Sequence, residues 1–570
     1  MELNKHMIYK DKNPHETVEC IHRYLNKEFN LTVSCTSSNM GDIAPSYTLA
    51  SRELCLITNG KGATDEFAQA SAYGEFFERL LNLSFVRLGN VTPMDLNINY
   101  PYSYYDKAAV YEEMRRIVSN EIGEATKIDN LASLYMDYVS AYYGKDCEQI
   151  PCIVFNSFSN KTTFFPVPVA DILLGTNGMS AGNTFEEAFV QGYSEILERK
   201  AVKDLNAGIV IPDLVESRLL DIPIMNSLKD NLKNNSNINI RVYTFERYYH
   251  FPIIALLVID PQRKEYKIKF GAHCTLEYAL ERCVSEMVQG AEMQDYSKWI
   301  HVQRAFLSDN GENMGIFKDG SGTLSSIALE NLLFTESVYG TDWFPESNSE
   351  AYNIIKSRNS DIFYVTNEDH PAVSMQVLIP NWSYISWLTE HDLKQLISQS
   401  KFDRMFFDFV SNEEKSAENV LEMYTILSKN YPPATTLKEI AQFLCPIQLQ
   451  YLKLITVEDM GLVVHSTNKD YLAVFEYFRK KSQENPADEY YGYATILAYN
   501  ALKNTKLPIS VSMFFSESVR KTVEDDFANN FQKLLHLNYC TQCPRKGMKN
   551  CIHEVKKRVC CAIVDKNERV

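Results

Sequence analysis

The stretch TNGMSAGNTFEEAFVQGYSEILERK, residues 176–200, joins a Gly-containing turn to a pattern typical of a helix. Thr184 is suited to capping the helix N-terminus, and Glu187 three residues later completes a capping-box pattern. In a helix of 3.6 residues per turn, the seventh, eleventh and fourteenth positions after the cap share one narrow face. The residues on this face are Gln191, Glu195 and Glu198. We therefore predict a helix with a stripe of carboxylates along one side.

Two further segments repeat this spacing. ITNGKGATDEFAQASAYGEFFERL, residues 57–80, and FGAHCTLEYALERCVSEMVQG, residues 270–290, each have a Thr followed by Ala at +4, a polar residue at +7 and Glu at +11. Residues 57–80 also share Glu at +14 and Arg at +15 with residues 176–200, whereas residues 270–290 have Gln and Gly there. The equivalent polar positions are Ser71, Glu75 and Glu78 in the first segment and Arg282 and Glu286 in the last. Spacing shared by three segments predicts a threefold internal repeat.

The repeated glutamates have two interpretations. A single helix of this kind usually turns its charged face to solvent. Three related helices that meet would instead surround one region with the carboxylates of Glu75, Glu78, Glu195, Glu198 and Glu286. Such a cluster needs cations, because like charges a few ångströms apart repel, and oxygen ligands suit Mg²⁺ shared with substrate phosphates. Arg199 and Arg282 would supply positive charge for a phosphate tail. Since Walker A and kinase motifs are absent, the residues indicate a different type of metal–nucleotide site.

The composition is that of a globular protein. The chain has 570 residues, 45% of them hydrophobic, and this length predicts two to four domains. Its formal net charge of −16 argues against a nucleic-acid-binding protein. Thirteen cysteines, most of them scattered singly, are typical of reduced thiols. The charged start, MELNKHMIYKDK, lacks the apolar segment of a signal peptide, and no apolar run could span a membrane. We expect a soluble, cytoplasmic protein.

The pattern of the sequence changes near residue 400. Residues 1–400 alternate short β-branched runs with helical patterns, which predicts an α/β (α+β) domain. Residues 401–539 show almost continuous helical periodicity interrupted by prolines, which predicts a helical domain of stacked α-hairpins, similar to tetratricopeptide repeats. Residues 540–570 form a basic, cysteine-rich tail.

The tail has the residue types of a metal site. Its spacing is Cys540-x2-Cys543-x7-Cys551-x-His553, followed by Cys560 and Cys561. Ligands of this kind bind zinc or an iron–sulfur cluster, and the candidates are Cys540, Cys543, Cys551 and Cys560. The alternative is a loop with reduced thiols. Its positive charge would suit docking to a partner, although a solvated terminus fits the same composition.

The three repeated segments resemble the signature blocks of the YcaO family, and the resemblance covers about residues 1–400. It implies an ATP- and Mg²⁺-dependent protein in which Glu75, Glu195 and Glu198 are magnesium ligands. The residues that resemble nucleotide contacts are Ser71, Glu78, Ser180, Asn183, Glu187, Gln191, Arg199, Arg282 and Glu286. Near the N-terminus, Lys10 and Thr17 lie where the family has a Lys and a Ser on the adenine side. Lys10 is equally compatible with an ordinary solvated lysine. The resemblance assigns no catalytic residue.

The family resemblance also implies a reaction. Its members transfer the ATP γ-phosphate to a backbone amide oxygen, which opens the amide carbon to a nucleophile. The helical extension and length resemble the stand-alone bacterial members, which implies an accessory role in β-methylthiolation of an aspartate in a small-subunit ribosomal protein, beside a radical methylthiotransferase. The ending DKNERV lacks the Pro-rich tail of azoline-forming members. We expect a homodimer that acts on a protein or peptide. The alternatives are a thioamide- or azoline-forming enzyme and a non-catalytic ATP-binding adaptor.

Overall fold

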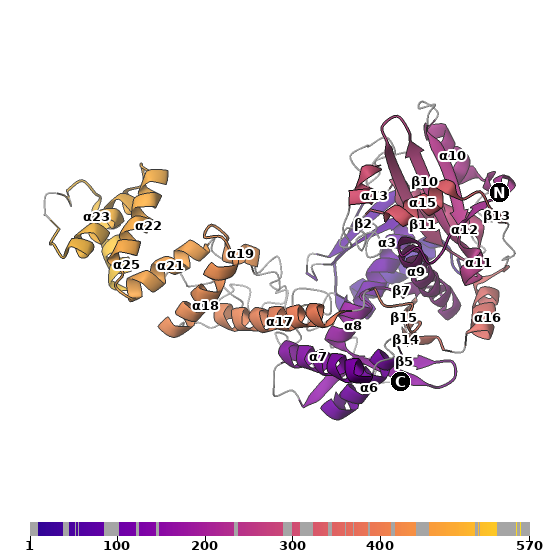
Figure 1. Ribbon diagram of the computed structural model, residues 1–570, viewed down its shortest axis with the longest axis horizontal. Helices are drawn as coiled ribbons and strands as arrows, with labels where there is room; N and C mark the ends of the chain where they lie inside the picture. The colour runs from indigo at the N-terminus through magenta and orange to yellow at the C-terminus, as the bar shows by residue number, and fades with distance from the viewer. Residues whose placement is uncertain are drawn as a thin grey trace. The chain divides into compact units, whose positions relative to one another are not determined.

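The chain divides into two compact units in the computed structural model (Figure 1). The described residues up to Gln395 belong to the first unit, and the second begins at Leu396. Each unit has its own hydrophobic core, as expected for a folding domain. The described residues are 10–37, 45–84, 102–120, 125–143, 148–232, 238–288, 299–307, 323–339, 345–411, 416–440 and 455–532, without 52, 55, 360, 369, 386–387, 508–510 and 512, and with the addition of 555 and 559.

Three sheets form the framework of the first unit in its described residues. Their strand orders are β1-β2-β3, β12-β11-β10-β9-β8-β13 and β4-β5-β14-β15-β7, and β6 pairs with β5. The first two sheets contain β1 Ser34–Ser37, β2 Ser46–Ser51, β3 Leu56–Lys61, β8 Asp213–Val215, β9 Asn239–Thr244, β10 Ile253–Asp260, β11 Glu265–Ala272, β12 Ile300–His301 and β13 Val338–Tyr339. The third contains β4 Ser103–Asp106, β5 Gln149–Ser157, β6 Thr162–Pro166, β7 Met179–Gly182, β14 Phe363–Asn367 and β15 Val373–Leu378. The unit is therefore a mixed α/β structure.

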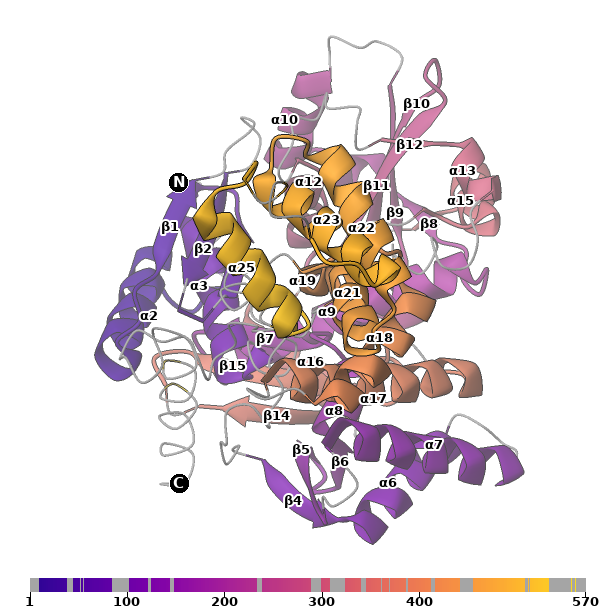
Figure 2. The ribbon, with the colours of Figure 1, turned by 90° about the vertical axis from the view of Figure 1, so that its left-hand side faces the viewer.

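Helices cover these sheets, as Figures 1 and 2 show. They are α2 Pro14–Phe29, α3 Asp65–Leu81, α6 Lys107–Ser119, α7 Ala125–Tyr143, α8 Val167–Leu173, α9 Phe185–Asn206, α10 Pro223–Leu232, α11 Glu246–Tyr249, α12 Leu276–Val288, α13 Gln303–Leu307, α15 Ser326–Phe334 and α16 Asn348–Arg358, with a 3₁₀-helix at Ser217–Leu220. α9 packs on β7 and β15 of one sheet and on β11 of another. Because it is enclosed in this way, its apolar residues Ala188, Phe189, Ile196 and Leu197 are fully buried.

Each of the three repeated segments forms a strand, a turn and a helix: β3–α3, β7–α9 and β11–α12. The predicted caps are confirmed, because the hydroxyls of Thr64, Thr184 and Thr275 accept hydrogen bonds from backbone amides in the first turn of their helices. The three strands lie in three different sheets. The threefold symmetry of the whole domain stays a prediction.

The predicted capping box at the start of α9 is only half correct. Thr184 Oγ1 accepts from the amide of Glu187, as predicted. The Glu187 carboxylate, however, accepts from the amide of Asn183 instead of from that of Thr184. Because the Glu187 side chain is directed one residue further back, its carboxylate can also contact residues outside α9.

Close contact between strand and helix requires glycine in each segment. A Cβ added at Gly182 would lie 2.4 Å from the Ala188 amide nitrogen, and one added at Gly271 would lie 2.4 Å from the Ala279 carbonyl oxygen. At Gly60 the corresponding distance to the Ala72 amide nitrogen is 2.0 Å. No side chain fits at these distances, so the glycines allow each strand to press directly on its helix.

The second unit is helical in its described part. α17 Glu390–Ser411 begins before the division and ends after it, and α18 Ala417–Asn430, α19 Leu437–Ile440, α21 Val457–Thr467, α22 Tyr471–Glu484, α23 Glu489–Lys503 and α25 Glu517–Ala528 follow. Its core includes Leu427, Met460, Val474 and Phe478, all buried. The similarity to tetratricopeptide repeats stays a prediction.

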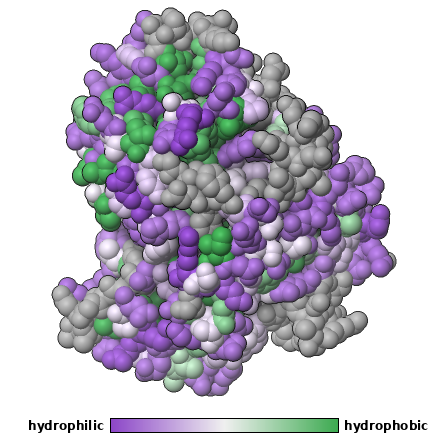
Figure 3. Space-filling model, turned by 90° about the vertical axis from the view of Figure 1, so that its right-hand side faces the viewer, coloured by the Kyte–Doolittle hydropathy of each residue, from purple (hydrophilic) through white to green (hydrophobic). Residues whose placement is uncertain are grey.

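The surface of the molecule is mainly polar on the face that Figure 3 shows, where apolar side chains gather only in separate patches. Among the helices in the described ranges, none is long and apolar enough to cross a bilayer. The four candidate cysteine ligands of the tail, Cys540, Cys543, Cys551 and Cys560, lie outside the described residues.

Candidate functional site

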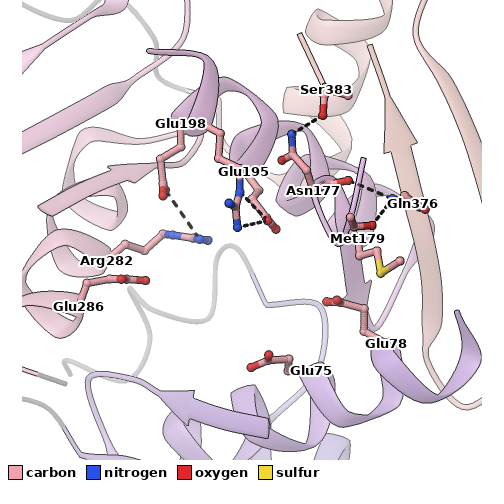
Figure 4. Close-up of polar contacts among 12 residues, drawn as sticks. Glu75, Glu78, Asn177, Met179, Glu195, Glu198, Arg282, Glu286, Gln376 and Ser383 are labelled. Atoms are coloured by element: carbon pink, nitrogen blue, oxygen red, sulfur yellow. Dashed lines mark hydrogen bonds and ion pairs between the residues drawn. The ribbon is translucent and has the colours of Figure 1, made fainter. Parts of the chain in front are cut away.

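Five glutamates from three helices point toward one shared region of the first unit (Figure 4). Glu75 and Glu78 come from α3, Glu195 and Glu198 from α9, and Glu286 from α12. We call these residues the acidic cluster. The three helices belong to the three repeated segments, so the structure brings together the stripes that the spacing aligned. The sequence alone could not show that the helices meet.

Burial gives two members of the acidic cluster unusual ionisation. Burial raises the pKa of Glu78 to about 8, and the neighbouring carboxylates of Glu75 and Glu195 add to this effect against the attraction of Arg79. Burial also raises the pKa of Glu198 to about 7, with further contributions from Glu286 and Glu195. The pKa of Glu75 is raised for the same reason. A bound cation would favour the charged forms of all three carboxylates.

Arginines lie among these carboxylates. Arg199 Nη2 is 3.1 Å from Glu195 Oε1, one turn away on the same helix. Arg282 Nη1 donates to Gln191 Oε1 at 2.9 Å, and its Nη2 is 4.0 Å from Glu198 Oε2.

Arg79 is a member of the site that the sequence reasoning did not select. Its guanidinium is 3.5 Å from Glu75 Oε1 and 3.3 Å from Glu78 Oε1, and it donates to the Met179 sulfur at 3.6 Å. The signal for it was present, since Arg79 and Arg199 occupy the same position in their segments.

Lys61 is a second residue that the sequence reasoning missed. Its ammonium donates to Glu286 Oε1 across 225 positions of the chain. Although burial raises the pKa of Glu286, the charge and hydrogen bond of Lys61, with the charges of Lys269 and Arg282, together lower it overall. Lys61 ends β3, so no helical spacing relates it to the glutamate stripes.

A second group of polar residues lies at the amino-terminal end of α9. Lys10 Nζ is 3.1 Å from Glu187 Oε1, and the Asn183 side-chain amide donates to Glu187 Oε2 at 3.0 Å. Thr17 Oγ1 donates to Asn183 Oδ1 at 2.9 Å. We call these four residues the amino-terminal cluster. The structure thus brings the N-terminal residues Lys10 and Thr17 to the second repeated segment.

Two predicted nucleotide contacts are placed differently from the rest. Ser180 is buried, and its hydroxyl donates to the Ala188 carbonyl oxygen at 2.7 Å, so it secures β7 against α9. Ser71 is exposed on α3. Neither hydroxyl belongs to one of the two clusters.

Buried amides secure the turn that precedes β7. The side-chain amide of Gln376 donates to the Asn177 carbonyl oxygen at 3.2 Å and to the Gly175 carbonyl oxygen at 3.3 Å. The Asn177 side chain donates to the Ser383 carbonyl oxygen at 2.8 Å. Figure 4 shows these groups beside the acidic cluster. They fix the turn that leads into β7, the strand on which α9 packs.

The donor set fits Mg²⁺ bound together with a nucleotide. In the described part of the chain, no three His, Cys, Asp or Glu side chains are grouped closely enough to hold a metal ion by themselves. Mg²⁺ does not require such a group, because it keeps several waters and takes one or two carboxylates together with substrate phosphates. The half-buried side chains of Glu75, Glu195 and Glu198, which come from α3 and α9 and face one region, can supply these carboxylates.

Comparison with known proteins identifies the family. Residues 59–383 match the family model described as YcaO cyclodehydratase, ATP- and Mg²⁺-binding. The chain belongs to the YcaO family. The match covers more than half of the chain and includes the second and third repeated segments in full and the first from Asn59 onward.

Two curated relatives are similar over part of the chain. An uncharacterised protein of Haemophilus influenzae is 27% identical over 350 residues, which are 58% of this chain and 57% of the relative. The ribosomal protein S12 methylthiotransferase accessory factor YcaO of Escherichia coli is 31% identical over 256 residues, 42% of each chain. The similarity thus spans about half the length of these two relatives.

Solved structures give weaker similarity. A heterocyclase in complex with substrate and cofactor has a TM-score of 0.44 at 16% identity, covering 65% of this chain and 53% of that one. YcaO from Methanopyrus kandleri, bound with AMPPCP and Mg²⁺, has a TM-score of 0.40 at 16% identity, covering 68% of this chain and 94% of that one.

Proposed function

We propose that this chain binds ATP with Mg²⁺ and uses the γ-phosphate to activate a backbone amide of a protein substrate. The observation that supports this most strongly is the acidic cluster, in which carboxylates from three segments face one region and two of them, Glu78 and Glu198, have raised pKa values. The family description of ATP and Mg²⁺ binding agrees with such a site.

The residues divide between metal and nucleotide. Glu75, Glu195 and Glu198 hold Mg²⁺, which would neutralise charge on the phosphates and align them for transfer. The amino-terminal cluster holds the adenosine part of the nucleotide. The remaining contacts come from Ser71, Glu78, Ser180, Gln191, Arg199, Arg282 and Glu286. Ser180 and Ser71 are the weakest members, because one hydroxyl is already committed to α9 and the other is exposed.

The chemistry follows from the poor leaving ability of an amide oxygen. In the proposed reaction the amide oxygen attacks the γ-phosphorus of ATP, and ADP leaves. A nucleophile then adds to the amide carbon, and the former amide oxygen departs with the phosphate. The protein contributes positioning and charge neutralisation instead of covalent catalysis. Accordingly, we assign no catalytic residue.

The proposed physiological role is that of an accessory factor for β-methylthiolation of an aspartate in a small-subunit ribosomal protein. The relative from Escherichia coli, 31% identical over 256 residues, is named for such a role with ribosomal protein S12. In this proposal the helical residues 401–539 form a homodimer or dock a radical methylthiotransferase. As a separate hypothesis, we propose that the Cys-rich tail binds zinc or an iron–sulfur cluster.

A second candidate is a peptide-modifying cyclodehydratase, which the family description itself names. It would use the same ATP site on a precursor peptide. A precursor-peptide gene beside the gene for this chain would favour it.

Two measurements test the proposal. Calorimetry of the full chain with ATP, with and without Mg²⁺, should show magnesium-dependent binding, and a folded protein that binds no ATP would contradict the proposed site.

In an Escherichia coli strain that lacks its own YcaO, expression of this chain should restore methylthiolation of S12, measured by mass spectrometry. Glu195→Gln should not restore it, whereas the exposed-site control Glu517→Gln should. ATP binding without restored modification would shift the assignment to the cyclodehydratase.

A further inference from the structure

The position of Lys61 is fixed by its neighbours. It is the last residue of β3 and lies between Gly60 and Gly62, which both press against α3. A Cβ at Gly62 would lie 2.7 Å from the Ala68 amide nitrogen, so this turn cannot move away from the helix without losing the contact. The side chain of Lys61 therefore starts from a defined point beside α3.

The ammonium of Lys61 connects two elements of the acidic cluster. It pairs with Glu286 on α12, and the side chain is 23% exposed. Its charge also opposes the rise that burial causes in the pKa of Glu75 on α3. Lys61 thus acts on carboxylates from both the first and the third repeated segments.

Lys61 differs from the arginines of the cluster. Arg79 and Arg199 pair with glutamates one turn away on their own helices, and Arg282 donates to the Gln191 side chain. A guanidinium in such a pair has a fixed, planar set of donors, whereas an ammonium on a four-carbon stem can change partner with little geometric cost. Among these cations, Lys61 is best suited to exchange a carboxylate for a phosphate oxygen.

We propose that Lys61 binds the phosphate tail of the nucleotide and that Glu286 holds its ammonium until the nucleotide arrives. This assignment rests on the proposed function. Lys61 lies at the acidic cluster and not at the amino-terminal cluster; Glu187 and Glu198 are separated by about three helical turns, roughly 16 Å. Metal and phosphates belong at the acidic end, because carboxylates from three helices face one region there. A triphosphate carries more negative charge than a diphosphate, so Lys61 selects ATP over ADP.

Calorimetry with the full chain and Mg²⁺ tests this assignment. Lys61→Gln should weaken ATP binding by about ten-fold or more, because a charge-assisted contact to the phosphate tail is lost. ADP binding should weaken by less than about three-fold, because a diphosphate carries less negative charge. Lys161→Gln is the matched control, since it also removes a lysine from an ion pair, here an exposed one with Asp361 outside the site. It should leave both affinities unchanged. Melting temperatures without nucleotide show whether each variant is folded.

The outcomes separate the two proposals. If Lys61→Gln weakened the binding of ATP and of ADP by the same factor, Lys61 would only support Glu286, and the assignment would be overturned. Unchanged affinities for both nucleotides would overturn it as well. Absence of binding by the folded native protein would overturn the proposed function and this assignment with it. If Lys61→Gln does not fold, Lys61→Met, which keeps the alkyl stem, is measured against the same two nucleotides.

Discussion

Two glutamates of one helix, Glu187 and Glu198 of α9, are both largely shielded from solvent, and yet their pKa values are shifted in opposite directions. The pKa of Glu187 is lowered, because Lys10 and the hydrogen bonds from Asn183 outweigh the effect of burial. The pKa of Glu198 is raised to about 7, because burial and the charges of Glu286 and Glu195 outweigh Arg282. Burial alone therefore does not decide the charge of a carboxylate; the supply of partners does.

The two ends of α9 differ in how many donors from the protein reach the carboxylate. The Glu187 carboxylate receives an ammonium, two donors from Asn183 and the amide of Asp11. The Glu198 carboxylate receives the Ala272 amide at 3.2 Å and a distant guanidinium. The first group is satisfied by the protein itself. The second receives fewer donors, and this difference is the physical reason for proposing Mg²⁺ at the acidic cluster.

The largest expected effect comes from separating α9 from its strand. Gly182→Ala would place a Cβ 2.4 Å from the Ala188 amide nitrogen, and backbone cannot yield as a flexible side chain can. We expect the free energy of unfolding to fall by about 3 kcal/mol, measured by urea denaturation.

Gly74→Ala is the control for this substitution. Gly74 lies within α3, and a Cβ there would meet nothing within 4 Å. Replacing a helical glycine by alanine should stabilise the protein by about 0.5–1 kcal/mol. Equal behaviour of the two variants would disprove the close strand–helix contact at the start of α9.

The second prediction removes one carboxylate from the acidic cluster. Glu195→Gln should weaken Mg²⁺-dependent ATP binding by about 100-fold, because a metal ligand and its charge are lost, and Glu75→Gln should do the same. Calorimetry measures the affinity, and thermal melting should show folded variants. Glu517→Gln, in an exposed pair with Lys521, serves as the control. Unchanged affinity in both site variants would contradict the carboxylate-cluster interpretation.

The third prediction removes the charge from the amino-terminal end of α9. Glu187→Gln keeps the shape of the side chain but loses the ion pair with Lys10, which is half-exposed. The free energy of unfolding should fall by about 1–2 kcal/mol, since hydrogen bonds to a charged group are lost. Glu186→Gln, on the same turn, should change it by less than about 0.5 kcal/mol. A variant as stable as the native protein would show that Lys10 and Asn183 do not stabilise this end.

The smallest expected effect is a pH dependence of the metal-free protein. The pKa of Glu78 is raised to about 8, so the folded state binds this proton more tightly than the unfolded state does. Stability from this group is therefore lost as the pH rises from about 4.5 towards 8. In EDTA, native protein should lose about 1 kcal/mol more than Glu78→Gln between pH 7 and pH 8.

For Glu187 the pH dependence of stability has the opposite direction. Its pKa is lowered, so its contribution is present above the ordinary carboxylate range and is lost as the pH falls through it. If the free energy of unfolding changed equally in native protein and in Glu78→Gln between pH 7 and pH 8, this would count against a proton held at Glu78.

Local features of the site could be predicted from the sequence. The caps at Thr64, Thr184 and Thr275, and the glutamates on a common helix face, follow from residue type and helical spacing alone. The position of the Glu187 carboxylate did not follow, because Asn183 and Lys10 compete for it with the capping box. Short-range rules describe a helix but not what approaches it.

Contacts between distant segments were beyond such rules. The pair of Lys61 and Glu286 spans 225 positions, and the anchoring of Asn177 by Gln376 spans 199. Neither has a periodic signal, since one partner lies at the end of a strand or in a turn. The commitment of the Ser180 hydroxyl to α9 depends in turn on the glycine-mediated approach of β7, which only the folded backbone shows.

The long separation between partners has a consequence during synthesis. Lys10 leaves the ribosome early, but its partner Glu187 follows 177 positions later, and Glu286 later still. At about 5–20 residues per second, roughly 15–60 s pass before the last member of the site has been made. Until α12 has been made, the glutamates of α3 lack the third helix of the acidic cluster. The nascent chain therefore cannot hold nucleotide in the proposed way until its third segment has emerged and folded.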